Sequence, residues 1–431
     1  MTQATLNAGQ QAAADGFFSF LFSEEKELII SGAGGVGKTF LMGYLIDEII
    51  PRYHSTCSLM GIPPQYHDVT MTATTNKAAE VLGEATNRPT TTIHSFLGLR
   101  VKENYFSGKT ELQKTGKWRV HQQEIIFIDE CSMIDSALRK CILEGTHKCK
   151  IVYVGDHSQL PPVFEPLSPI YRDNITCYEL TQPMRNAAQP HLTKLCDQIR
   201  ETVRTGVFNP IQAIPGVIDW LHEDELLNEI NKHFVTNQTE SRILAYANAT
   251  VNSLNSYLRN SKGLPEQYTV GEHLISNSAL QIQGGQISVE EPVEILAIDG
   301  EEEFIELAKD VGFHVRRMDV RTKIGGTFHK VAVPTDRAHF EQLVKYFAKI
   351  KDWVTYFNLK NGYPDLRPRD ASTVHKSQGS TYDTIFIDLD SLSTCHQPDI
   401  AARLLYVAMT RPSNRVIMYG KLAAKYGGVV E

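Results

Sequence analysis

Short apolar runs, mostly of β-branched residues, alternate with segments of helical periodicity along the first 180 residues. Such runs predict strands that are covered on both faces, because a strand with one exposed face shows polar alternation instead. The clearest runs are residues 27–31, 69–73, 124–129 and 150–156. Between the first two, apolar residues recur at the spacing of one helix face: Phe40, Leu41, Tyr44, Leu45 and Ile49. This alternation predicts a parallel sheet with helices on both faces.

A second block of the same kind follows. Its clearest strands are residues 242–247 and 384–389, and residues 404–409 are typical of a buried helix. Two segments break the pattern. Residues 101–120 are polar around a Ser-Gly-Lys turn, which predicts an inserted β-hairpin. Residues 281–366 mix strand signals, paired glycines and one helical run, which predicts a module inserted in the second block.

Length and composition restrict the class of protein. A chain of 431 residues suits two to four domains rather than one core. With 42% hydrophobic and 22% charged residues and no apolar stretch of bilayer length, we expect a soluble protein without a membrane segment or signal peptide. The seven cysteines are scattered without a CxxC pair. This favours reduced thiols in a cytoplasmic protein over a zinc site or a disulfide framework.

The net charge of −7 is not typical of a nucleic-acid-binding domain, whose surface is usually basic. It does not exclude one. A motor must release each phosphate that it binds, and a local basic groove on an acidic protein is compatible with that requirement.

Residues 32–39, with the sequence GAGGVGKT, match the pattern GxxxxGK[ST] between a predicted strand and a predicted helix. Glycines allow backbone N–H groups to surround phosphates, and we assign such contacts to Gly32, Gly34, Gly35, Val36 and Gly37. Lys38 would contact the β- and γ-phosphates, and the Thr39 hydroxyl would bind Mg²⁺. The alternative is a glycine-rich turn without nucleotide, but the motif and its context agree on ATP.

Two further motifs end predicted strands. Asp129 and Glu130 follow the apolar run 125–128, at the strand end where ligands bind in open α/β sheets. Asp129 would hold Mg²⁺, and Glu130 would deprotonate the attacking water. Alone, this pair would be a solvated strand end. Gln159, in the sequence GDHSQLPP, could contact the γ-phosphate, and a loop stiffened by proline is an equal alternative.

The motifs resemble those of superfamily 1 helicases of class B, in the Dda-like and RecD-like branch, over nearly the whole chain and in the same order. The segments that carry this resemblance, besides the phosphate loop, are LNAGQ (6–10), TATTNKAA (72–79), TIHS (92–95), DECS (129–132), GDHSQLPP (155–162), LTQPMR (180–185), STVHKSQG (372–379) and YVAMTR (406–411). The last two are the most discriminating. One departure is Thr74, which stands where the family often has proline.

The resemblance implies two RecA-like domains that bind ATP and Mg²⁺ between them. The implied nucleotide contacts beyond the phosphate loop are Gln10 for adenine, Gln378, Gly379, and the γ-phosphate arginines Arg185 and Arg411. The implied contacts to single-stranded DNA are Thr75, Asn76, Thr92, His94, Thr373 and His375. For each lone Thr or His, a helix cap or a satisfied core group is the alternative.

The resemblance also implies domain limits. Residues 1–180 would form the first RecA-like domain, with the hairpin near 101–120 as its insertion. Residues 181–280 and 367–431 would form the second, and residues 281–366 an SH3-like insertion. In this branch the hairpin acts as a pin that splits duplex DNA, and Phe106, with Tyr105 second, is our candidate for stacking on a base. The alternative is that Phe106 folds back into the core.

We therefore expect an ATP-dependent DNA helicase that moves 5′ to 3′ on single-stranded DNA. We expect a monomer that binds single strands and single-strand/duplex junctions, with replication or recombination proteins as candidate partners. A translocase that strips proteins without separating strands would share the motifs. A phosphate-loop kinase or nucleotide switch, from a different class, would lack the second RecA-like domain.

Overall fold

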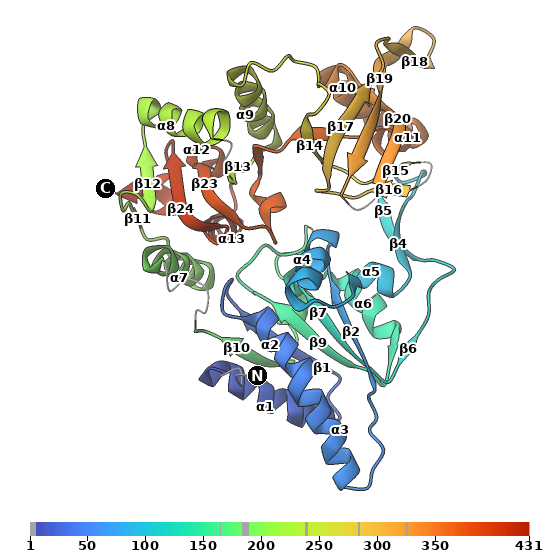
Figure 1. Ribbon diagram of the computed structural model, residues 1–431, viewed down its shortest axis with the longest axis vertical. Helices are drawn as coiled ribbons and strands as arrows, with labels where there is room; N and C mark the ends of the chain where they lie inside the picture. The colour runs from blue at the N-terminus through green and yellow to red at the C-terminus, as the bar shows by residue number, and fades with distance from the viewer. Residues whose placement is uncertain are drawn as a thin grey trace. The chain divides into compact units, whose positions relative to one another are not determined.

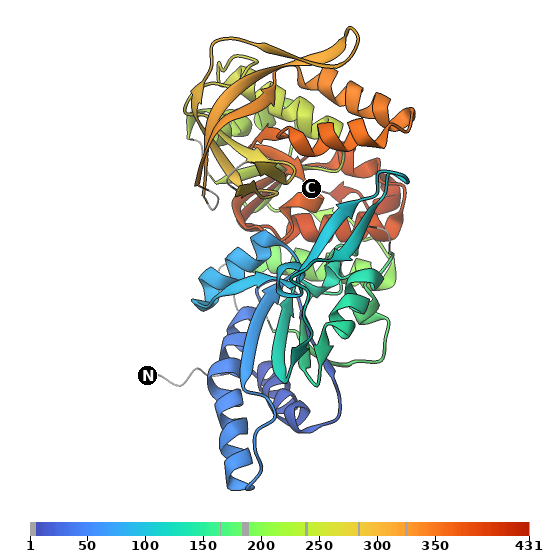
Figure 2. The same ribbon diagram turned by 90° about the vertical axis from the view of Figure 1, so that its right-hand side faces the viewer.

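The computed structural model, shown in Figures 1 and 2, describes residues 6–163, 165–182, 189–237, 240–282, 285–323 and 326–430. The chain packs into two compact units. The first contains residues 1–100, 112–222 and 377–431, and the second contains residues 101–111 and 223–376. No helix in the described ranges is both long and apolar enough to cross a membrane.

The main sheet of the first unit has six strands, and every pairing between neighbours is parallel. In spatial order the strands are β10 (Thr176–Leu180), β1 (Glu27–Gly32), β9 (Lys150–Gly155), β7 (Glu124–Asp129), β2 (Asp68–Ala73) and β3 (Thr90–Thr92). Four of them coincide, within a residue or so, with the four predicted apolar runs. The prediction of a parallel α/β sheet is confirmed.

Both faces of this sheet are covered, which explains why its strands lack polar alternation. Leu28, Phe127 and Val152 pack into the core on one face of the sheet, whereas Ile29 and Ile126 pack into a second core on the other face. The first core is covered by α1 (Ala8–Phe22), α2 (Lys38–Tyr44), a π-helical turn (Leu45–Ile49) and α3 (Ile50–Leu59). The second is covered by α5 (Ile93–Phe96) and α6 (Ser136–Glu144).

A second group of parallel strands completes the first unit. In spatial order they are β12 (Ile218–Leu221), β24 (Pro412–Tyr419) and β23 (Tyr382–Asp388). Two helices pack against each other beside them, α7 (Pro190–Thr205) and α13 (Pro398–Met409), each with proline in its first turn. All six residues of the predicted buried segment 404–409 are buried in α13. Shorter elements are α12 (Leu389–Ser393), β11 (Ile211–Gln212), β25 (Val429–Val430), β6 (His121–Gln122) and β8 (Thr146–His147).

The second unit combines a parallel strand pair with an antiparallel sheet. The pair is β13 (Ser241–Ala245) with β22 (Ala371–Thr373), beside α8 (Glu223–Ile230) and α9 (Asn248–Ser261). The antiparallel sheet contains β18 (Glu303–Ala308), β19 (Val311–Thr322), β17 (Pro292–Ile298), β14 (His273–Ser276) and β21 (Leu366–Pro368), with β20 (Gly326–Pro334) beside β19. Strands β14 and β21 lie at and beyond the edges of the predicted insertion 281–366. They are short, so the sequence pattern did not distinguish them.

Two helices and two small hairpins complete this unit. The helices are α10 (Arg337–Lys349) and α11 (Trp353–Gly362), and one hairpin is β15 (Leu280–Ile282) with β16 (Gly285–Ile287). The other hairpin is β4 (Leu99–Glu103) with β5 (Thr110–Lys114), inside or next to the segment where a hairpin is predicted. Its tip, residues 101–111, packs in the second unit, although the sequence inserts it into the first block. Conversely, residues 377–431 pack in the first unit.

Candidate active site and nucleic-acid interface

The glycine-rich loop at residues 32–37 connects β1 to α2, and its shape depends on glycine. Gly35 and Gly37 have φ angles of 83° and 82°, in the left-handed region that other residues rarely adopt. A Cβ atom on Gly32 would lie 2.7 Å from the Leu180 carbonyl oxygen and 2.8 Å from a methyl group of Val36. The loop therefore has the strand–loop–helix context that a phosphate loop requires.

Two polar side chains hold this loop from within the first unit. The Lys38 ammonium donates to the carbonyl oxygens of Gly32 at 2.7 Å and Ala33 at 2.9 Å. The buried Gln10 amide donates to the Val36 carbonyl at 3.3 Å, and its side-chain oxygen accepts from the Asn7 N–H at 3.2 Å in a capping box that starts α1. Gln10 thus joins the first helix to the loop, and its contact with adenine stays a prediction.

Asp129 and Glu130 lie at the carboxyl end of β7. The Asp129 carboxylate accepts the Glu130 N–H at 2.9 Å, and burial, reinforced by the Glu130 charge, raises the pKa of Asp129 to about 7, although Lys38 acts in the opposite direction. One carboxylate oxygen of Glu130 is buried without a hydrogen-bond partner in the described protein. Two acidic groups with this deficit of positive charge fit a divalent cation.

No group of three or more His, Cys, Asp or Glu residues gathers around a possible metal position within the described residues. A cation at Asp129 would therefore need other oxygen ligands. Mg²⁺ commonly binds through one or two protein groups together with the phosphates of a nucleotide. Asp129 and the Thr39 hydroxyl are the two protein groups that the sequence assigns to this mode.

Thr74, the residue that departs from the helicase pattern, contacts the backbone of the acidic pair. Its N–H donates to the Asp129 carbonyl at 3.3 Å, and its hydroxyl donates to the Glu130 carbonyl at 3.3 Å. A proline at this position could make neither bond. Thr74 thus connects the segment after β2 directly to the segment after β7.

The loop at residues 156–159 is bonded to α13 and to the segment before β23. The Gln378 amide donates to the side-chain oxygen of buried Gln159 at 2.9 Å. The Arg403 guanidinium donates to the Gln159 carbonyl at 2.7 Å and also to the His157 carbonyl. The Tyr406 hydroxyl donates to the Asp156 carboxylate at 2.5 Å.

Our sequence reasoning did not select Arg403 or Tyr406. The sequence could have indicated Arg403, because it is the only charged residue in the otherwise apolar stretch 400–409. A charge that is kept in a buried helix has to be paired or hydrogen-bonded. Gln159 and Gln378 were predicted separately as nucleotide contacts, and the structure brings the two side chains together. Gly379, the next residue in the chain, has a φ angle of 79°.

Arg411 follows the last residue of α13 by two positions and is buried. Its guanidinium donates to the Val407 carbonyl at 3.0 Å, the Ser380 carbonyl at 3.1 Å and the Thr410 hydroxyl at 2.8 Å. Contact with a γ-phosphate would require Arg411 to exchange some of these acceptors. The other predicted arginine, Arg185, lies outside the described residues.

The predicted DNA contacts of the first unit have structural partners. The Thr75 hydroxyl caps α4 (Asn76–Thr86) by accepting the Ala78 N–H at 3.2 Å. The Thr92 hydroxyl caps α5 by accepting the Ser95 N–H at 3.1 Å. The capping alternative is therefore real for both threonines, and each hydroxyl still has a hydrogen to donate. Burial lowers the pKa of His94, which favours a neutral ring at pH 7.

In the second unit, Thr373 ends β22 and is buried, and His375 follows in a 3-10 turn (Val374–Ser377). The His375 ring lies 6.1 Å from the ring of Tyr246, and burial lowers its pKa. A neutral imidazole can donate a hydrogen bond to DNA but cannot neutralise a phosphate. Its role as a DNA contact stays a prediction.

Phe106 at the tip of the β4–β5 hairpin is 98% exposed, so the alternative that it belongs to the core is wrong. Tyr105 instead packs on Phe357 of α11, with ring centroids 5.3 Å apart. A Cβ atom on Gly108 would lie 2.5 Å from the ring of Trp353.

A third contact between the hairpin and α11 is a hydrogen bond, in which the Asn361 amide donates to the Glu103 carboxylate at 3.1 Å. Residues 353, 357 and 361 are spaced one helical turn apart, so they share one face of α11. The hairpin therefore lies along that face, with its tip at the start of α11, and both views show it reaching this helix (Figures 1 and 2).

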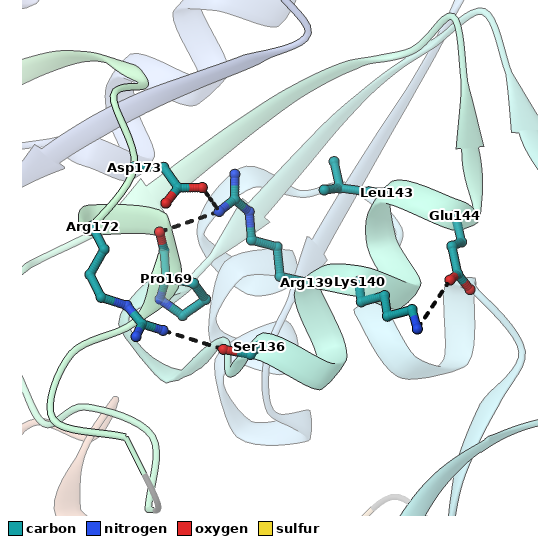
Figure 3. Close-up of a pocket in the computed structure, with 8 residues that line it drawn as sticks. All are labelled: Ser136, Arg139, Lys140, Leu143, Glu144, Pro169, Arg172 and Asp173. Atoms are coloured by element: carbon teal, nitrogen blue, oxygen red, sulfur yellow. Dashed lines mark hydrogen bonds and ion pairs between the residues drawn. The ribbon is translucent and has the colours of Figure 1, made fainter.

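A separate surface pocket of the first unit lies beside α6 (Figure 3). It is lined by Ser136, Arg139, Lys140, Leu143, Glu144, Pro169, Arg172 and Asp173. Its charges are largely paired inside the protein: Arg139 with Asp173 and with Glu27 at 3.1 Å, and Lys140 with Glu144 at 3.9 Å. None of the predicted site residues lines this pocket.

Comparison with known proteins agrees with this geometry. Residues 20–165 match the family model of an AAA domain, and residues 370–419 match that of the UvrD-like helicase C-terminal domain. The ATP-dependent DNA helicase dda of Enterobacteria phage T4 is 25% identical, over 95% of this chain and 98% of that protein. The RecBCD enzyme subunit RecD of Buchnera aphidicola is 30% identical over 32% of this chain and 23% of its own.

The fold is also that of solved helicases. The structure of Bacteroides Pif1 helicase in complex with ADP-AlF3 and ssDNA aligns over 100% of this chain and 95% of that one, with a TM-score of 0.53 and 16% identity. A structure of Pif1 helicases at forked dsDNA aligns over the same shares with a TM-score of 0.54 and 18% identity. Fold, phosphate loop and C-terminal match define a helicase-type nucleotide hydrolase. Over nearly its whole length the chain is similar to the helicase dda, and its fold is that of the Pif1 helicases.

Proposed function

We propose that this protein is an ATP-dependent DNA helicase, which hydrolyses ATP to move along single-stranded DNA and separate duplex strands. The observation that carries the proposal is that one compact unit holds the phosphate loop, the acidic pair after β7 and the bonded set Gln159–Gln378–Arg403. The UvrD-like match at residues 370–419 contradicts the alternative of a phosphate-loop kinase or nucleotide switch.

The residues of the site have complementary roles in this reaction. Lys38 would balance the charge of the β- and γ-phosphates once it leaves the loop carbonyls that it now contacts. Glu130, with one unpartnered carboxylate oxygen, would accept the proton of the attacking water. Bound Mg²⁺ would supply positive charge to the phosphate oxygens, and Asp129 and Thr39 would hold it.

The remaining nucleotide residues would sense the γ-phosphate. Gln159 and Gln378 already bond to each other, so a phosphate that engages Gln159 would also affect the segment that leads into β23. Arg411 and Arg185 would stabilise the charge of the transition state. If ATP contacts Gln159 and Gln378 together, its binding and loss would bias two conformations of the protein.

Single-stranded DNA is the proposed track. Thr75, Asn76, Thr92, His94, Thr373 and His375 would contact its backbone, which requires little sequence information. Phe106 would stack on a base at the junction with duplex DNA, since its ring has nothing to cover it in the described protein. This exposure favours strand separation over a translocase that only strips proteins. We further propose that the protein acts as a monomer, alongside replication or recombination proteins.

Direction of movement rests on membership in class B, which implies 5′ to 3′ along the tracking strand. The test is unwinding of partial duplexes that carry only a 5′ or only a 3′ single-stranded tail. We expect strand separation with the 5′ tail alone. Unwinding of only the 3′-tailed substrate would contradict the direction, and the absence of ATPase stimulation by single-stranded DNA would contradict the helicase function itself.

A further inference from the structure

The helices α10 and α11 carry a concentration of positive charge that the proposed reaction does not use. Residues 342–361 contain four lysines and one acidic residue, in a chain with a net charge of −7. The acidic residue, Asp352, is occupied in capping α11, where it accepts the Thr355 N–H at 3.1 Å and the Thr355 hydroxyl at 2.7 Å. Lys345, Lys349 and Lys351 are exposed and have no acidic partner in the described part of the chain.

The hairpin tip lies at this basic turn. Gly108 contacts Trp353, the first residue of α11, while Tyr105 and Glu103 contact later turns of the same helix. The direction of the hairpin is thereby fixed. Exposed Lys109 follows Gly108 directly in the chain, and Lys349 and Lys351 precede Trp353 by four and two residues. The exposed Phe106 thus lies on a hairpin tip that carries Lys109 and reaches the turn with Lys349 and Lys351, while the acidic residue Glu111 of the same hairpin is bonded to Asn104 at 3.1 Å.

We propose that the hairpin tip and the turn between α10 and α11 form a binding surface for the phosphate backbone of duplex DNA ahead of the strand junction. The proposal rests on the helicase function above and names a further part of its substrate. A duplex carries one negative charge per about 1.7 Å of its axis. A duplex end that stacks on Phe106 therefore brings many phosphates close to Lys109, Lys349 and Lys351.

The character of these groups favours the DNA backbone over a protein partner. Lysines are flexible point charges that suit phosphates of any sequence, as a moving enzyme requires. A protein partner would instead use the exposed apolar side chains of this turn, which are Tyr346 and Ile350, each 52% exposed, and Val354, 55% exposed. The excess of unpaired lysines and their position beside the hairpin tip support duplex DNA as the occupant.

The test uses the full-length variant Lys349→Gln/Lys351→Asn. Asparagine suits position 351 because its φ of 61° is left-handed, a conformation that asparagine tolerates. The matched control is Lys309→Gln, an exposed lysine on the turn between β18 and β19 of the same unit. Binding is measured by fluorescence anisotropy over a range of salt concentrations. The three DNA probes are a single strand, the same strand as a 5′ tail on a duplex, and that tailed duplex with a second, unpaired arm.

We expect the slope of log affinity against log salt for the tailed duplex to become shallower by about 2, since each lost phosphate contact removes about 0.9. The slope for the single strand should not change, and the control and the melting temperature should match the wild type. An equal change with the single strand would overturn the proposal in favour of the tracking strand. A change only with the second arm would overturn it in favour of the displaced strand.

Unchanged slopes on all three probes would also overturn the proposal and leave an acidic protein as the candidate occupant. Failure of the proposed helicase function gives a different result, because the wild-type protein would then bind none of the three probes and show no ATPase stimulation by single-stranded DNA.

Discussion

The candidate nucleotide site and the hairpin surface are constructed in opposite ways. In the nucleotide site the polar groups are mostly buried and bonded to one another, as Gln159 is to Gln378 and Arg411 is to three acceptors. On the hairpin surface, Phe106 and the lysines of the α10–α11 turn are exposed, whereas Tyr105 on the inner face of the hairpin packs on Phe357. The polar groups of the nucleotide site mostly have partners within the protein, whereas the hairpin surface presents groups that need an external partner.

Because of this difference, some functions can be separated by mutation and others cannot. A buried group with several partners supports both the chemistry and the local structure, so its loss affects ATP turnover and sometimes folding. An exposed group supports only what it touches from outside. Changes on the hairpin should therefore impair strand separation without lowering ATP hydrolysis, and the following predictions can break or refine that distinction.

The largest effect is expected from Glu130→Gln, because an amide cannot accept the proton of the attacking water. ATP turnover should fall to background while ATP binding remains, whereas Lys38→Ala should abolish turnover by removing the main positive charge at the phosphates. Turnover is measured by phosphate release and binding by a fluorescent ATP analogue. Glu124→Gln, at the other end of β7, is the matched control and should retain its activity. Turnover of Glu130→Gln at the wild-type rate would show that another group is the base.

Arg411→Lys should lower kcat on the order of a thousandfold, because an ammonium cannot bind the phosphate oxygens in the bidentate way of a guanidinium. ATP binding should fall much less. Arg415→Lys, which changes an arginine paired with Asp219 in the same unit, is the control and should keep normal turnover.

The three protein acceptors of Arg411 make a structural role the competing explanation. The melting temperature distinguishes the two. A marked drop in melting temperature without a specific loss of kcat would indicate that Arg411 is structural, and the nucleotide site would then depend on Arg185 alone.

Phe106→Ala should slow strand separation while leaving DNA-stimulated ATPase and melting temperature unchanged. Stacking of a base on an aromatic ring contributes about 1–3 kcal/mol, which corresponds to a rate loss of roughly 5- to 150-fold. Phe304→Ala, at a 48% exposed phenylalanine of β18 in the same unit, controls for removal of any exposed ring. If Phe106→Ala unwinds DNA at the normal rate, the hairpin does not separate strands through this residue.

The smallest effect is expected from Gly108→Ala, which tests whether the contact with α11 positions the hairpin. The added methyl group would collide with Trp353, and we expect unwinding to fall on the order of a few-fold. The double variant Gly108→Ala/Trp353→Ala should recover part of the loss. Gly271→Ala is the control, since Gly271 has a φ of 83° but nothing within 4 Å of the added atom. An equal loss in both glycine variants, without recovery, would mean that backbone strain and not the contact is responsible.

Local sequence was enough for the core of the first unit. The runs at 27–31 and 124–129 predicted strands because residues buried on both faces of a sheet are apolar at every position. The phosphate loop was evident because Gly35 and Gly37 adopt backbone angles that favour glycine. The glycines of the motif therefore indicate the conformation of the loop. In both cases the information lies within a few consecutive residues.

The remaining features depend on residues far apart in the chain. Thr75 and Thr92 have the same residue type whether they cap a helix or contact DNA, and only the structure shows the caps. Arg403 became relevant when α13 brought it to the loop at 156–159.

The hairpin shows most clearly which features the sequence alone does not predict. The sequence determined that a hairpin with an aromatic residue forms near residue 106, because a polar segment around a Ser-Gly-Lys turn favours it locally. It could not indicate that Phe106 stays exposed while Tyr105 packs, since the partner of Glu103 in α11 is 258 residues away. Only the packing of the hairpin against α11 decided which aromatic ring remains available to DNA, because burial depends on what the fold places beside each side chain.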